Sequence, residues 1–109
     1  MSRRVSIRAV AAASLTAFLV LSAGGAMAQD AREGQRLARQ WCVGCHVVGP
    51  QGPGGDRGPA FASIAKDPRR TPNRLRGWLA DPHPPMVNPG LSNAEIESII
   101  AYIQTLRDS

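Results

Sequence analysis

The chain has 109 residues, with 13 lysines and arginines against 8 aspartates and glutamates, which gives a formal net charge of +5. This length fits one domain with a small core and excludes a large multidomain enzyme. No basic stripe interleaved with aromatic residues is present outside the N-terminal segment, which argues against nucleic-acid binding.

The first 28 residues are typical of a secretory signal peptide. Three arginines at positions 3, 4 and 8 precede an uncharged, mostly apolar run over residues 9–21, and residues 26–28 form an A-x-A cleavage site. We therefore expect a signal peptide at 1–28, export to the periplasm, and a mature domain at 29–109 with a charge of 10 minus 8, or +2. The apolar run is shorter than the roughly 20 residues that span a bilayer. An uncleaved membrane anchor remains the alternative.

A helix is predicted next, over Ala31–Val43. Asp30 and Glu33 form an N-terminal capping pair. Apolar or small residues then recur at helical spacing on one side: Gly34, Leu37, Ala38 and Trp41. This helix would deliver the following segment at its C-terminal end.

That segment, Cys42-Val43-Gly44-Cys45-His46, contains the only two cysteines of the chain. Cys-x-x-Cys-His is the attachment signature of a covalently bound c-type haem. Two thiols at this spacing can form thioethers to the two vinyl groups of one porphyrin, and the next residue, His46, is then placed to ligate the iron. A thioredoxin-type dithiol or half of a metal site is the alternative. The first would need a βαβ setting, and a structural zinc site would need more ligands than two cysteines and two histidines.

Residues 47–70 form a long irregular segment with five glycines and four prolines. Such a segment is too long for an ordinary connection. We expect it to wrap a bound group, because an 81-residue mature domain needs something to enlarge its core. A short turn of helix is predicted around Ala60–Ala65.

Six basic residues lie between positions 56 and 76, with only Asp56 and Asp67 to balance them. They are Arg57, Lys66, Arg69, Arg70, Arg74 and Arg76. A solvated face and a docking patch are both compatible with this cluster.

The next helix is predicted from its start and stop signals. Thr71-Pro72 provides an N-cap and a first-turn proline, and Asp81-Pro82 ends the segment. Leu75, Trp78 and Leu79 share one face of it.

The C-terminal helix has the clearest signals. Ser92 and Glu95 form a capping box, with Leu91 and Ile96 spaced as a hydrophobic staple. An amphipathic stripe then follows, formed by Ile96, Ile99, Ile100, Ile103 and Leu106. No alternating pattern favours strands, so an all-α fold is expected.

A second iron ligand can be assigned to Met86, the only methionine that remains after signal cleavage. It lies on the proline-stiffened segment 84–89, which can present the sulfur with little freedom to lose. A thioether in this position stabilises ferrous iron. His83 is the alternative ligand. The simplest alternative role for Met86 itself is to fill space in the hydrophobic core.

With these features together, the chain resembles a small class I cytochrome c of the bacterial periplasmic type. The resemblance covers nearly all of the mature chain and is carried by Gly34, the Cys42–His46 box, Gly58-Pro59, the 75–79 segment, Pro85-Met86 and residues 99–103. It implies that the first and last helices cross at Gly34, near Ile99 and Tyr102. It also implies that the Pro59 carbonyl accepts the second imidazole proton of His46.

The function that follows from the resemblance is that of a periplasmic electron carrier and not an enzyme. One haem c would be tethered by Cys42 and Cys45 and ligated by His46 and Met86, so that its iron passes single electrons between redox proteins whose identity the sequence does not give. We expect a monomer without stable membrane insertion.

The expected packing around the haem involves three aromatic residues. Trp78 and Phe61 would pack against the porphyrin, and ordinary core packing is an equally simple account of both. The family commonly has an aromatic residue at the position that Ala38 occupies in this chain. Trp41 would take over the packing of that aromatic residue. A haem peroxidase or ligand-binding haem protein is the alternative function, but it would need an open sixth site.

Overall fold

Helices form the regular structure of the protein in a computed structural model that describes residues 30–82 and 84–109. Residues 30–41 are helical and are followed by α2 (Phe61–Lys66), α3 (Pro72–Ala80) and α4 (Asn93–Thr105), with a 3₁₀ turn at Leu106–Asp108. Within those two ranges the only β pairing is an isolated bridge between Val47 and Gly54. The all-α prediction is confirmed. The predicted signal peptide and His83 lie outside the described residues.

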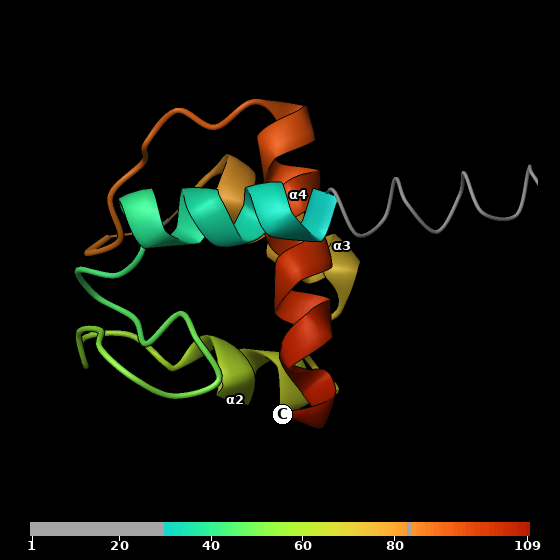
Figure 1. Ribbon diagram of the computed structural model, residues 1–109. Helices are drawn as coiled ribbons and strands as arrows, with labels where there is room; N and C mark the ends of the chain where they lie inside the picture. The colour runs from blue at the N-terminus through green and yellow to red at the C-terminus, as the bar shows by residue number, and fades with distance from the viewer. Residues whose placement is uncertain (1–29, 83) are drawn as a thin grey trace, which may run out of the picture.

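The helix of residues 30–41 crosses α4, as Figure 1 shows. The contact is made at Gly34, where an added Cβ would overlap the carbonyl oxygen of Ser98 and lie 2.8 Å from the Cβ of Tyr102. A glycine is needed here because the two backbones approach too closely for any side chain. The crossing expected from the resemblance is therefore present. Gly34 meets α4 at Ser98, which is next to the expected Ile99, and at the expected Tyr102.

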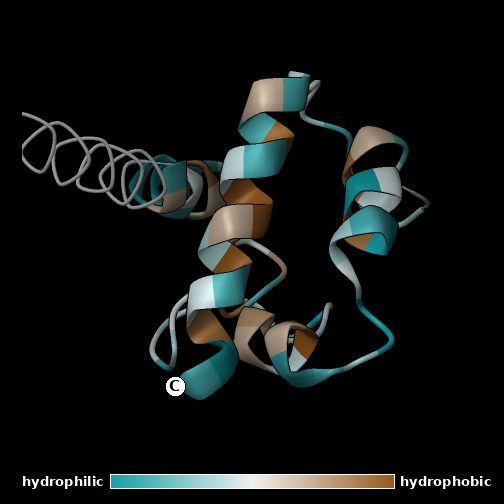
Figure 2. Cartoon of the chain, turned by 90° about the vertical axis from the view of Figure 1, so that its right-hand side faces the viewer, coloured by the Kyte–Doolittle hydropathy of each residue, from teal (hydrophilic) through white to brown (hydrophobic). Residues whose placement is uncertain are grey.

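α4 begins with the predicted capping box. The Ser92 hydroxyl accepts from the Glu95 backbone N–H at 3.2 Å, and the Glu95 carboxylate accepts from the Ser92 N–H at 2.8 Å. All five residues of the predicted stripe are buried. Hydrophobic positions recur along α4 in Figure 2. They pack with residues of the other helices, of which Ala38 and Leu37 are the most deeply buried, at 0% and 1% exposure.

The two middle helices follow their sequence signals closely. α2 starts at Phe61, one residue after the prediction. In α3 the Thr71 hydroxyl accepts from the Arg74 N–H at 3.3 Å and caps the helix. Leu75 and Leu79 are buried, whereas Trp78 is 43% exposed, so the predicted common face holds only for the two leucines.

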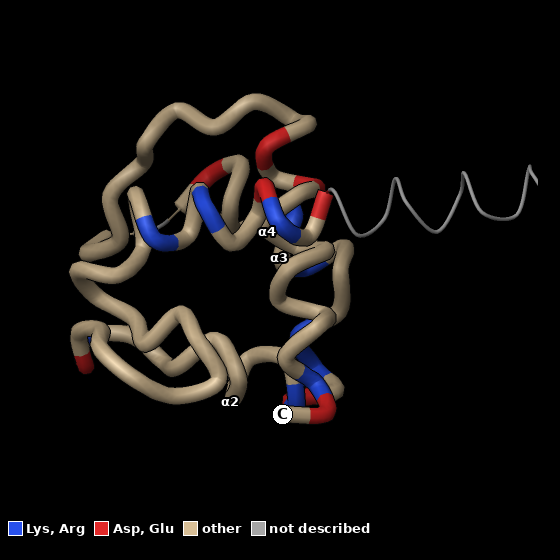
Figure 3. The backbone as a smooth tube through the Cα atoms, viewed as in Figure 1, with Lys and Arg blue, Asp and Glu red and all other residues tan. Residues whose placement is uncertain are grey.

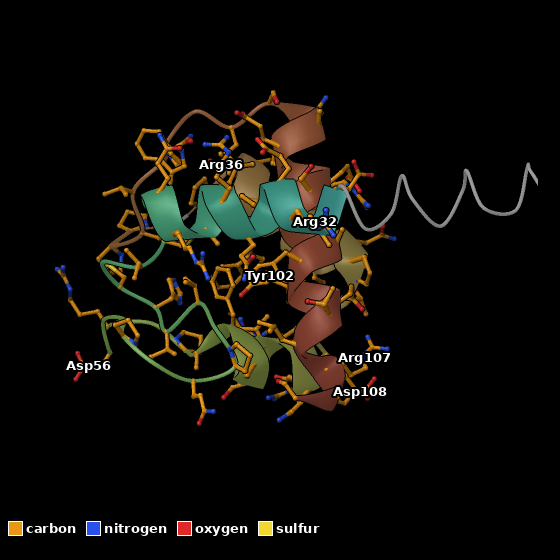
Figure 4. The ribbon with its side chains drawn as sticks, in the orientation of Figure 1. Arg32, Arg36, Asp56, Tyr102, Arg107 and Asp108 are labelled. Atoms are coloured by element: carbon orange, nitrogen blue, oxygen red, sulfur yellow. The ribbon has the colours of Figure 1, made fainter. Side chains whose placement is uncertain are left out.

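Tyr102 ties α4 to the segment that follows the cysteine box. Its hydroxyl donates a hydrogen bond of 2.6 Å to the backbone carbonyl of Val48, and both residues are buried. Figure 4 shows Tyr102 projecting from α4 into the interior of the molecule. This bond anchors the irregular segment two residues after His46. Among the described helices, none combines the length and apolarity needed to cross a membrane.

Candidate functional site

The cysteine box forms a tight turn directly after the first helix. The helix ends at residue 41, two residues before the predicted end. The Cys42 N–H still donates to the Ala38 carbonyl at 2.9 Å, and the N–H groups of Cys45 and His46 both donate to the Cys42 carbonyl, at 3.1 and 3.0 Å. The turn therefore holds both thiols and the imidazole within one short, hydrogen-bonded stretch.

One pocket brings together the residues that the sequence analysis selected. Its lining includes Cys42, Cys45, His46, Pro59, Trp78 and Met86. The remaining lining residues are mostly apolar: Trp41, Arg57, Gly58, Leu79, Pro82, Pro85, Val87, Pro89 and Leu91. One wall comes from residues 41–59 and the other from residues 78–91.

The large hydrophobic residues that are exposed in the described chain all line this pocket. Trp41 is 48% exposed, Trp78 43% and Val87 73%. Exposed apolar side chains that gather in one place mark a binding site for an apolar group. The pocket therefore suits a mostly apolar ligand such as a porphyrin.

His46 is oriented by its surroundings. Its Nδ1 lies 2.6 Å from the Pro59 carbonyl oxygen, which fits an Nδ1–H donating to that oxygen. Such a bond leaves Nε2 as the nitrogen with a free lone pair. The backbone of Gly58 lies against the imidazole, because an added Cβ would be 2.8 Å from Nδ1 and 2.9 Å from Nε2.

The Cys42 thiol does not have the lowered pKa that is typical of a redox-active dithiol. Burial raises the pKa of the Cys42 thiol to about 11, with the neighbouring Cys45 adding to the shift. Catalytic thiols of dithiol oxidoreductases have lowered pKa values, because the thiolate is the nucleophile. In the part of the chain that the structure describes, no three histidine, cysteine or acidic side chains gather where they could hold a metal ion.

Met86 lines the same pocket as the cysteine box. It is partly buried and packs against the hydrophobic core as well as lining the pocket. The segment that carries it is closed by a turn in which the Asn88 side chain accepts from the Gly90 N–H at 2.9 Å, with Gly90 at φ +72°. The alternative ligand His83 lies outside the described residues.

The basic cluster is partly neutralised by acidic side chains. Asp67 pairs with Arg69 at 3.0 Å and with Arg70 at 3.7 Å, and Arg76 pairs with Glu97. The hydrogen bonds from Arg69 lower the pKa of the Asp67 carboxyl to about 2.

Charged residues are absent from the two loops that contribute to the pocket walls. Segments 42–55 and 82–94 contain no lysine, arginine, aspartate or glutamate. In Figure 3 the charges gather mainly on the helices. Asp56 lies at the outer tip of the loop beyond the first uncharged segment (Figure 4).

The comparisons with known proteins agree with this pocket. The cytochrome c family profile matches residues 31–107. The chain belongs to the cytochrome c family. It is 42% identical over 87 residues to cytochrome c-552 of Bradyrhizobium diazoefficiens, a match that covers 79% of this chain and 84% of that protein. The comparison with solved structures gives no match.

This cytochrome is thus a class I c-type cytochrome with the all-α fold of its family, and its cofactor is a covalently bound haem c with iron. The family and the relative support a role as an electron carrier with redox partners. The pocket fits this cofactor because it places both thiols, an imidazole and a thioether on mostly apolar walls.

Two expectations about the aromatic residues need correction. Trp41 lines the pocket and is half exposed, so it does not fill the place of an aromatic residue beside Ala38, which is itself fully buried. Phe61 is not among the pocket-lining residues and belongs to the buried core, where its ring lies 5.4 Å from that of His46. Trp78 does line the pocket, and the Arg70 guanidinium lies 5.6 Å from the centroid of its indole.

Several pocket residues were missed by reasoning from the sequence. Val87, Pro89, Leu91 and Arg57 had no role assigned beyond turn, staple or charge. The signal that could have found the first three is the uncharged run of residues 82–94, since a loop without charges is unusual on a surface and is typical of the wall of an apolar site.

Proposed function

We propose that this cytochrome is a periplasmic single-electron carrier whose haem c is held by thioethers to Cys42 and Cys45 and ligated by His46 and Met86. The arrangement that carries the proposal is the single pocket lined by all four side chains. When bound, the haem supplies an iron centre that takes up and releases one electron at a time. Export depends on the signal peptide proposed for residues 1–28.

The protein side of this function is orientation and exclusion of water. The Pro59 carbonyl, 2.6 Å from Nδ1 of His46, holds the proton on that nitrogen and leaves the lone pair of Nε2 free to bind the iron. Met86 faces the pocket from a segment stiffened by prolines, so little conformational entropy is lost when its sulfur is fixed. A histidine and methionine ligand pair raises the reduction potential of haem iron.

The apolar walls contribute a second effect. Leu79, Leu91 and Val87 line the pocket with hydrocarbon, and no lysine or acidic side chain is among its lining residues. A low dielectric around the cofactor disfavours the more highly charged oxidation state, which also raises the potential. Both effects favour a carrier that keeps its electron until it meets an acceptor.

The test uses the full chain expressed in a bacterium that has the machinery for haem attachment. We expect a haem-staining band in the periplasmic fraction of a denaturing gel, and a mass equal to that of the polypeptide that begins at Gln29 plus one haem. Titration of the purified protein should follow a one-electron Nernst curve. Haem that is lost on denaturation, or a protein that stays with the cytoplasmic fraction, would contradict the proposal.

A further inference from the structure

Three groups enclose the imidazole of His46. The Pro59 carbonyl oxygen lies 2.6 Å from Nδ1, and the backbone of Gly58 leaves no room for a side chain against the ring. The third group is the ring of Phe61, whose centroid lies 5.4 Å from the imidazole centroid with an angle of 57° between the planes. This distance is within the range of directly packed aromatic rings.

Phe61 is a fixed wall of this enclosure. Its side chain is 4% exposed and belongs to the hydrophobic core. It is the first residue of α2, and its backbone N–H donates to the carbonyl of Val47 at 2.9 Å. Val47 directly follows His46, so Phe61 is tied to the histidine by the backbone as well as by ring contact. The hydrogen bond holds the backbone of Phe61 in place, and the phenyl ring cannot shift without disturbing the core.

The phenyl ring restrains the imidazole in a way that the hydrogen bond does not. A hydrogen bond tolerates a wide range of donor angles before it weakens. The hydrogen bond therefore determines which nitrogen carries the proton, but it restrains the rotation of the ring less tightly. Packed hydrocarbon surfaces in a protein interior tolerate only small displacements. Phe61 and Gly58 together therefore limit how far the plane of the imidazole ring can turn.

We propose that Phe61 is a positioning residue that sets the plane of the His46 imidazole and, through it, the electronic properties of the haem iron. The inference rests on the proposed ligation of the iron by His46. The plane of an imidazole ligand decides which iron d orbitals its π electrons overlap. Groups that orient a ligating histidine are a known means of tuning a metal centre.

The test compares variants of the ferric holoprotein by proton NMR, because the order and spread of the haem methyl resonances depend on the plane of the axial imidazole. Phe61→Leu removes the flat ring and keeps an apolar side chain. Phe61→Met also removes the ring and keeps an apolar side chain, and it replaces Phe61→Leu if the leucine variant does not accumulate. Phe61→Tyr keeps the ring. Ile64→Val is the matched control, since Ile64 is buried on the same helix and does not line the pocket.

We expect Phe61→Leu to change the order or spread of the methyl resonances and to shift the midpoint potential. Phe61→Tyr and Ile64→Val should keep the wild-type pattern. The inference is overturned if Phe61→Leu keeps the wild-type pattern of methyl resonances. It is also overturned if Ile64→Val changes the pattern as much as Phe61→Leu does while the two variants lose a similar amount of thermal stability. A wild-type protein without the low-spin ferric spectrum of histidine ligation would instead refute the proposed function, before any variant is compared.

Discussion

Gly34 and Tyr102 touch where the first helix crosses α4, so closely that a Cβ added to Gly34 would lie 2.8 Å from the Cβ of Tyr102. The same atom would overlap the backbone carbonyl of Ser98. Gly77 in α3 is the opposite case, because nothing lies within 4 Å of a Cβ added there. The two helical glycines therefore lead to predictions of opposite sign.

Gly34→Ala should lower the free energy of unfolding by about 1–3 kcal/mol, because the helices must separate to admit the methyl group. Gly77→Ala should raise it by about 0.5–1 kcal/mol, since glycine loses more conformational freedom than alanine in a helix. Denaturant unfolding of the two holoproteins measures both. A Gly34→Ala variant as stable as the wild type would contradict the packing described at the crossing.

Replacing Cys42 or Cys45 with alanine should leave at most one thioether. We expect a weaker haem stain on a denaturing gel and a lower yield of folded protein, because a domain of this size depends on the cofactor for part of its core. Val43→Ala is the control, since it changes the same turn and keeps both thiols. A haem-free variant with both cysteines replaced that folds in wild-type yield would be incompatible with this dependence.

The Asp67 carboxyl should contribute to the acid sensitivity of the protein. Hydrogen bonds from Arg69 lower its pKa from 3.8 to about 2. The carboxyl has a lower pKa in the folded than in the unfolded protein, so it stabilises the fold at any pH above its pKa in the unfolded chain. This stabilisation is lost as the pH falls from about 4 to about 2. Asp67→Asn should lower stability at neutral pH and flatten this part of the pH profile.

The control for this measurement is Asp56→Asn, which removes an exposed carboxyl at the tip of the loop. It should leave the profile between these pH values unchanged. Added salt should weaken the effect of Asp67, because its partner Arg69 is solvent-exposed. Equal behaviour of the two variants would show that the Asp67 ion pairs do not contribute.

The basic cluster from Arg57 to Arg76 should behave mainly as a solvated face. Asp67 and Glu97 offset part of its charge, and uncharged loops contribute to both walls of the pocket. Replacing Arg69, Arg70 and Arg74 with glutamine should therefore leave electron-transfer rates with hexacyanoferrate close to the wild type. The ionic-strength slope of those rates should change little, since Asp67 already offsets part of the charge of Arg69 and Arg70. A much flatter slope in the triple variant would favour a docking patch.

Much of the fold could be predicted because its signals are local. The capping box at Ser92, the proline at position 72 and the stripe from Ile96 to Leu106 each act within a few residues, and the structure confirms all three. The crossing at Gly34 came from resemblance to a family. A glycine on a helix face does not by itself name its partner.

The rest depends on contacts between distant parts of the chain. No local pattern relates Tyr102 to Val48, 54 positions away, or brings Arg76 to Glu97. Trp41 shows the same limit, because its helical spacing placed it on the packed side of the first helix. The helix ends at this residue, and the indole lines the pocket instead.

The near-infrared absorption of the ferric protein tests most directly whether Met86 is the second iron ligand. A weak band there is the signature of sulfur bound to ferric haem. We expect the wild type and His83→Ala to show this band. Met86→Ala should lose it, keep the covalent haem and have a lower reduction potential, because the thioether favours ferrous iron. If the wild type lacks the band and His83→Ala changes the ferric spectrum, His83 is the ligand and the account is contradicted.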